Sequence, residues 1–179
     1  MPRNEESLSA SEVNRIRQEA LQGELGFDGE PDPVEMVTDD HAHLQLLLNE
    51  YEGNERGERY DMLQRILNVL DNHLRLEEEV LYPSIALQGQ EGRRAVAAAR
   101  DMHARIRGLM KPLRHARRMD RRTDAAFGAL EMLLEEHAEW EEAEIHPMTY
   151  DMGQGDLAAM GEAMLTLRGT PSGVRRRET

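Results

Sequence analysis

The apolar residues of this chain recur every three or four positions over long stretches, which is the period of an amphipathic α-helix. Four stretches predict long helices over residues 33–51, 59–81, 93–119 and 123–145, and a fifth predicts a short last helix over 156–167. Short turns join the long helices, so we expect neighbours in the chain to run antiparallel. The predicted fold class is all-α, an up-down-up-down four-helix bundle.

Local signals set the expected ends of these helices. Asp32 before Pro33 is the pattern of an N-cap followed by proline in the first turn. Pro83 is expected to end the second helix, and Pro112 to kink or end the third, because proline has no backbone N–H to donate. Thr123 is expected to cap the fourth helix.

The chain divides into three predicted parts. Residues 1–32 form an N-terminal extension in which a short helix is followed by glycines and prolines. It is either a docking arm or lid, or a partly ordered tail, which we favour. Residues 33–167 form the bundle, with the short last helix covering one of its ends. Residues 168–179 are interpreted as a disordered tail.

Two of the long helices carry the same polar motif on their apolar faces. It reads His-x-x-x-Glu-Glu and is followed by a proline, with His73 and Glu77 in the second helix and His137 and Glu141 in the fourth. Residues four apart lie on one face of a helix. Each imidazole and its carboxylate can therefore reach one metal ion.

The other two long helices each place one histidine on the apolar stripe, His41 in the first and His103 in the third. His43 lies on the other side of its helix and is given a surface role. The candidate metal ligands are therefore His41, His73, Glu77, His103, His137 and Glu141. This set is too large for one tetrahedral zinc ion and suits two metals, with iron, manganese or zinc favoured. The alternative is that these histidines are ordinary core or surface residues.

The order and spacing of these residues resemble those of the hemerythrin-like, or HHE cation-binding, domains. The resemblance covers roughly residues 33–167. It implies a four-helix bundle with a non-heme di-iron site, whose ligands would be the four histidines and the two glutamates. Glu77 and Glu141 would then be the bridging carboxylates. The expected cofactor is two iron ions, with manganese or zinc as alternatives.

The chain departs from the oxygen-carrying members of that family at two positions. Their fifth histidine is replaced by Arg107, and their last carboxylate, an aspartate, by Glu142 beside Glu141. This pattern is similar to that of the symmetric branch of the family. The metal positions without a histidine would then either stay open or be filled by Glu78, Glu142 or water. Arg107 would either position an anionic ligand or point to solvent. Tyr82 and His146 precede the two prolines, and a packing role is predicted for both, with contact to the metal ligands or electron relay as the alternative.

The resemblance implies a protein that binds or senses O2 or a related small oxidant. One alternative is a di-iron oxidoreductase that acts on hydrogen peroxide or nitric oxide. A second alternative is a metal-dependent iron-sensing or structural module. O2, peroxide or nitric oxide is the expected partner in the first two cases.

Composition limits the other classes of function. The net charge of −13 argues against nucleic acid as a partner, because such binding depends on neutralising phosphates. There is no cysteine, so any metal must be held by histidine and carboxylates. No apolar run approaches the length of a membrane span, and the first residues do not form a secretory signal. We therefore expect a cytoplasmic protein without a membrane partner.

Overall fold

The computed structural model describes residues 31–55, 58–118 and 120–169, and this part of the chain is helical with no strand. The long helices are α2 (Pro33–Gly53), α3 (Arg59–Leu76), α5 (Gln90–Arg114) and α6 (Arg121–Glu144). The shorter elements are a π-helical turn (Glu77–Leu81), α4 (Tyr82–Ala86), a 3₁₀ turn (His146–Thr149) and α7 (Gln154–Arg168). The predicted extension, except Pro31 and Asp32, lies outside the described residues, as does the predicted tail beyond Gly169.

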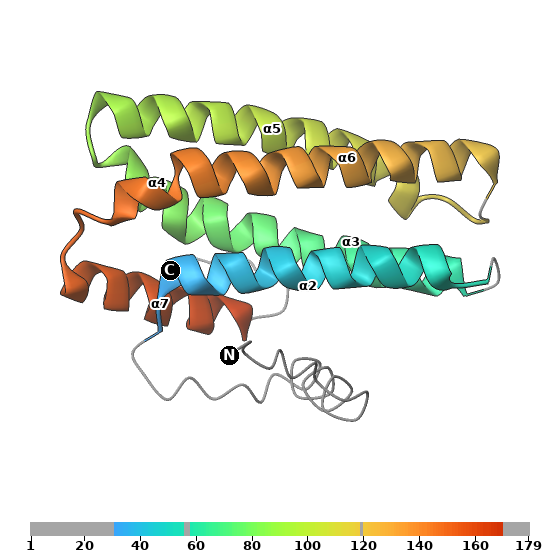
Figure 1. The fold of residues 1–179 in the computed structure, drawn as a ribbon, viewed down its shortest axis with the longest axis horizontal. Helices are drawn as coiled ribbons and strands as arrows, with labels where there is room; N and C mark the ends of the chain where they lie inside the picture. The colour runs from blue at the N-terminus through green and yellow to red at the C-terminus, as the bar shows by residue number, and fades with distance from the viewer. Residues whose placement is uncertain (1–30, 56–57, 119, 170–179) are drawn as a thin grey trace, which may run out of the picture. The chain divides into compact units, whose positions relative to one another are not determined.

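The four long helices lie along a common direction and successive ones run in opposite senses (Figure 1). The α5 helix packs on α6 and α2 packs on α3, while α7 packs against α2, α3 and the π turn. The prediction of an all-α helical bundle is therefore confirmed. None of the helices in the described ranges is long and apolar enough to cross a lipid bilayer.

Two of the long helices, α2 and α6, begin at an aspartate that caps them, and one of the two predicted caps needs correction. The Asp32 carboxylate accepts hydrogen bonds from the backbone N–H groups of Val34 and Glu35, so its predicted capping role is confirmed. The cap of α6 is Asp120, and the prediction of Thr123 was wrong. Asp120 accepts from the Thr123 backbone N–H, while the Thr123 hydroxyl donates to the Arg118 carbonyl.

Pro83 does not end the second helix, contrary to prediction. The backbone N–H of Tyr82 donates to the carbonyl of Glu77, five residues back, and the helix continues through the π turn into α4. Pro83 then falls in the first turn of α4, where its missing N–H is tolerated. Because the π turn has more residues per turn than an α-helix, Tyr82 lies on the same side of the helix as Glu77, one turn further along.

The third helix is shifted toward the N-terminus relative to its prediction. It starts at Gln90, after Gly89 makes the turn with a φ of 99° that glycine readily adopts. It ends at Arg114 instead of Met119, two residues after Pro112. Pro112 is thus tolerated inside the last turn.

The buried apolar residues form two clusters, one toward each end of the bundle. The first cluster includes Leu44, Leu48, Leu70, Ile106, Phe127 and Leu134. The second includes Val37, Leu76, Leu81, Ala99, Ile145 and Met160. The candidate ligands lie close to the boundary between the two clusters along each helix, as His41 does between Val37 and Leu44. The bundle therefore has a polar layer with an apolar layer on either side.

Candidate metal centre

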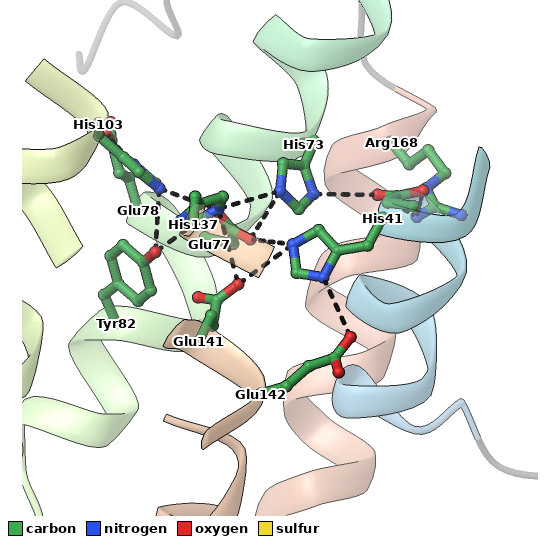
Figure 2. A network of polar contacts seen from close by, with 11 residues as sticks. His41, His73, Glu77, Glu78, Tyr82, His103, His137, Glu141, Glu142 and Arg168 are labelled. Carbon is green, nitrogen blue, oxygen red and sulfur yellow. Dashed lines mark hydrogen bonds and ion pairs between the residues drawn. The ribbon is translucent and has the colours of Figure 1, made fainter. Parts of the chain in front are cut away.

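The polar layer gathers five of the six predicted ligands into one group. Ligand atoms of His41, His73, Glu77, His137 and Glu141 all lie within 4.8 Å of one another. Figure 2 shows these side chains converging from α2, α3, the π turn and α6. His73, Glu77, His137 and Glu141 are at most 1% exposed, so water has little access to most of the group.

Glu77 stands at the middle of this layer and faces three histidines. Its Oε1 lies 2.9 Å from His73 Nε2, while its Oε2 lies 3.0 Å from His103 Nε2 and 3.6 Å from His137 Nε2. His103 is not part of the tight group, but it approaches the layer through this oxygen. The two oxygens of one carboxylate thus point toward different histidines, an arrangement suited to bridging two cations.

Glu141 and His41 meet on the other side of the layer. The Nε2 of His41 lies 3.5 Å from Glu141 Oε2 and 3.8 Å from Glu77 Oε1, and Glu141 Oε2 is also 3.8 Å from His137 Nε2. All four predicted histidines therefore present Nε2 to the carboxylates at the centre. His43 is half-buried and is not part of the group.

The outward-facing nitrogens of two histidines meet carboxylates that are themselves held by arginine. His103 Nδ1 lies 2.8 Å from Glu78 Oε1, and Arg107 donates to both Glu78 oxygens at 2.6 and 3.1 Å. His73 Nδ1 lies 3.9 Å from Asp40, whose oxygens each accept from Arg168 at 2.8 Å. Carboxylates in this place orient metal-binding histidines.

These contacts give Arg107, Glu78 and Glu142 definite positions. Arg107 pairs with Glu78 behind His103, so its guanidinium is engaged there. Glu142 lies 3.9 Å from the Nδ1 of His41 and is half-exposed, at the outer side of the layer (Figure 2). Glu78 and Glu142 thus face the outer nitrogens of two histidines.

Tyr82 contacts the centre, which the sequence offered only as the alternative to a packing role. Its hydroxyl lies 3.0 Å from His103 Nε2 and 3.5 Å from Glu77 Oε2, and the side chain is fully buried. The packing role was favoured because the sequence suggested a regular α-helix, in which Tyr82 would lie further from the ligands. His146 is buried in its predicted place near the end of α6, and its Nε2 has no hydrogen-bond partner among the described residues.

The charges of the layer are strongly coupled when no cation is present. Burial acts to lower the pKa of His73, but the nearby carboxylates of Glu77 and Asp40 outweigh it and raise that pKa to about 10. Burial and the charge of Glu77 hold the pKa of Glu141 well above its ordinary value. Burial and the neighbouring His73 lower the pKa of His41 to about 3. The layer therefore holds protons at some sites and neutral imidazoles at others.

These residues fit a bound metal. Within the described part of the chain, neither ring nitrogen of His41 and neither oxygen of Glu141 has a hydrogen-bond partner, although all four atoms are buried. Leaving buried polar atoms unpaired is unfavourable, and a cation between them would satisfy them. Imidazole nitrogens and carboxylate oxygens are donors that iron, manganese and zinc accept. The layer is a His/Glu cluster able to bind metal.

Comparison with known proteins agrees with this description. The family model of the hemerythrin HHE cation binding domain matches residues 32–149. The crystal structure of a hemerythrin HHE cation binding domain-containing protein from Mycobacterium kansasii aligns with a TM-score of 0.67 and 20% identity, covering 77% of this chain and 88% of that one. At that identity the likeness concerns the fold. No curated protein sequence matched. The chain belongs to the hemerythrin HHE cation-binding domain family.

Proposed function

We propose that this protein holds two iron ions in the polar layer and binds or senses O2 or a related small oxidant there. The observation that carries the proposal is the buried set of four histidines and two glutamates, most of them without access to water and several with unpaired polar atoms. The apolar clusters on both sides of the polar layer would keep bulk water away from a bound ligand.

The chain's own residues have separate roles in this proposal. His41, His73, His103 and His137 would be terminal ligands, and Glu77 would bridge through its two differently directed oxygens, with Glu141 as a second carboxylate. Iron, when bound, would supply electrons to a small oxidant. Glu78 and Asp40 would hold the imidazole rings in place.

A second candidate function is an oxidoreductase acting on hydrogen peroxide or nitric oxide. The observation that favours it is the buried hydroxyl of Tyr82, which lies within reach of His103 and Glu77. Burial and the charges of Glu77 and Glu141 raise the pKa of Tyr82, so the phenol stays protonated and can donate a hydrogen bond. A donor in this place suits the reduction of a small oxidant more than its simple storage.

The test is an anaerobic titration of the iron-loaded, reduced protein with O2. The measured quantities are the iron content per chain and the visible spectrum before and after deoxygenation. We expect two irons per chain and a coloured species that disappears when O2 is removed. Rapid, irreversible oxidation would instead favour the oxidoreductase, and peroxide and nitric oxide turnover would then be measured.

Two other outcomes would count against the proposal. Protein that retains zinc or manganese and does not react with O2 would favour the structural or iron-sensing role. Protein that retains no metal of any kind would overturn the assignment of the polar layer as a metal centre.

A further inference from the structure

A cavity of about 280 Å³ lies between α2 and α6 and leads to the polar layer. We call it the α2–α6 cavity. At its inner end it is lined by His41, His73 and His137, three of the proposed ligands. It is also lined by exposed residues such as Gln45 and Glu139, so it opens at the surface of the bundle.

The walls of this cavity are mainly apolar. Leu44, Leu48 and Leu134 line it together with Ala42 and Ala138. The two alanines leave space where a larger side chain would fill the passage. Such walls offer little to a strongly hydrated ion and suit a small molecule that gives up its water readily.

One of the proposed ligands faces this cavity directly. The side chain of His41 is 8% exposed and lines the cavity, and neither of its nitrogens has a hydrogen-bond partner among the residues described. His73 and His137, by comparison, are 1% exposed. The side of the centre at His41 is therefore the one that a ligand from solvent reaches first.

The outer part of the cavity is acidic. Glu135, Glu139 and Glu142 line it, and apart from the three histidines none of its described lining residues is basic. Figure 2 shows Glu142 on the outer side of His41, with its carboxylate toward the ring. Several negative charges around a narrow passage repel an anion and leave an uncharged molecule unaffected.

We propose that the α2–α6 cavity is the access route to the metal centre and that it admits small uncharged molecules in preference to anions. The proposal rests on the proposed function, because it takes the polar layer as the place where a small oxidant binds. It keeps the uncharged candidates, O2, nitric oxide and hydrogen peroxide, and disfavours small anions as ligands.

The first test fills the passage with Ala138→Phe. Nitric oxide is mixed with the iron-loaded, reduced protein, and its association and dissociation rates are followed by absorbance. Both rates should fall several-fold by the same factor, so the dissociation constant stays the same. Ala129→Phe is the matched control, since Ala129 is exposed on the same helix and does not line the cavity.

A second pair of variants covers the case in which Ala138→Phe fails to fold. Gln45→Trp places a large side chain at the exposed part of the cavity, and Asn49→Trp places it on the same helix outside the cavity. The rates should fall only in Gln45→Trp. Unchanged rates in a folded cavity variant, or a change in the dissociation constant alone, would overturn the access route.

The second test removes charge from the acidic part with Glu135→Gln and Glu139→Gln together. Azide, an anionic probe, should bind this variant several-fold faster than the parent protein at low ionic strength. The increase in rate should be smaller at high ionic strength, because salt screens exposed charges. The rate for uncharged nitric oxide should not change. Glu144→Gln with Glu162→Gln changes the net charge equally at exposed sites outside the cavity and serves as the control. An unchanged azide rate would overturn the preference against anions.

A measurement without metal separates this proposal from the proposed function. Xenon is added to the metal-free protein, and its binding is followed by xenon nuclear magnetic resonance. A bound signal that Ala138→Phe removes supports an accessible apolar cavity, and no bound signal in the parent protein overturns it. Iron-loaded protein that binds neither nitric oxide nor azide would contradict the proposed function, with the xenon result still deciding the cavity.

Discussion

Glu141 is fully buried beside Glu77, and neither of its oxygens has a hydrogen-bond partner within the described residues. Burial and the charge of Glu77 raise its pKa well above the ordinary value. A group whose pKa is higher in the folded state contributes to the free energy of unfolding, and the contribution is complete below the pKa of the unfolded state. It is lost as pH rises through the pKa of the folded state. The same carboxylate that would bind metal therefore destabilises the metal-free protein at higher pH.

Glu141→Gln should consequently lower metal content and stabilise the metal-free protein. The free energy of unfolding of the metal-free variant should exceed that of the parent by about 1–3 kcal/mol at alkaline pH, the size of a buried unpaired polar group. The difference should shrink as pH falls and Glu141 becomes protonated. Urea denaturation across pH measures this, with Glu144→Gln, exposed on the same part of the chain, as the control.

Full metal retention by Glu141→Gln would contradict the ligand assignment. A metal-free variant that is less stable than the parent at every pH would contradict the electrostatic argument.

Tyr82 allows a second test at the level of one side chain. Tyr82→Phe keeps the buried ring and removes the hydroxyl that lies 3.0 Å from His103. If the centre reduces peroxide, turnover should fall about 10²-fold, the usual effect of losing a general acid, while iron content stays the same. Tyr150→Phe is the control because Tyr150 is 77% exposed. Equal turnover in parent and Tyr82→Phe would exclude the hydroxyl as a proton donor.

The residues of the polar layer could be predicted from the sequence better than the residues that contact them. The i, i+4 spacing pointed to His73, Glu77, His137 and Glu141, because such pairs on a helix face the same way, and the apolar stripes pointed to His41 and His103. Their role as metal ligands stays a prediction. Contact between Tyr82 and the ligands was only the less favoured alternative, because it depends on the π turn, which no local sequence pattern predicted. Arg168 was missed because it reaches Asp40 from 128 residues away.

The helices themselves were predicted with errors at their ends. Prolines were the main cause, since Pro83 follows a π turn and Pro112 lies in a last turn, where the missing N–H does little harm. In α2, Met36 is buried in the cluster that also contains Met160 and Met164 of α7, and Leu47 is buried in the other cluster.

The α7 helix approaches the start of α2 so closely that only glycine fits between them. A Cβ on Gly161 would lie 1.8 Å from the backbone oxygen of Pro31. This contact fixes the position of a helix that also supplies Arg168, whose guanidinium holds Asp40 beside His73. The helix beyond the family match at residue 149 therefore contributes to the surroundings of the centre.

Gly161→Ala should destabilise the protein by about 1–3 kcal/mol, because a methyl group against backbone forces the chain to move. Gly155→Ala in the same helix has open space around its Cβ and should be neutral or stabilising by up to about 1 kcal/mol. Thermal denaturation of both variants measures the contrast. Equal stability of the two would show that α7 does not pack as described.

Taken as a whole, the metal-free molecule holds protons where the metal-bound molecule would hold cations. His73, with its pKa raised to about 10 mainly by Glu77 against the effect of burial, stabilises the metal-free fold fully below its ordinary pKa of 6.5 and loses that contribution as pH rises through about 10. His41, whose pKa burial lowers to about 3, contributes above 6.5 and loses its contribution as pH falls toward 3. The metal-free protein should be most stable near neutral pH.

Metal binding should release protons and strengthen as pH rises. A bound His73 must be neutral and a bound Glu141 must be ionised, so each would lose a proton when the cation enters. Calorimetric titration with zinc at about pH 6 and about pH 8, in buffers of different ionisation enthalpy, measures proton release and affinity together. Affinity that is independent of pH would contradict the protonation states described for the layer.

The polar layer between two apolar clusters has a consequence for how the helices find their alignment. Leucine-rich faces can slide past one another by a helical turn of about 5.4 Å and still bury apolar surface. A slide of one helix here would place a glutamate or histidine opposite leucine, with no charged or polar partner. The polar layer therefore favours one alignment of the four helices along the bundle axis. We expect a bundle with leucines in its place to be more stable and less uniquely folded.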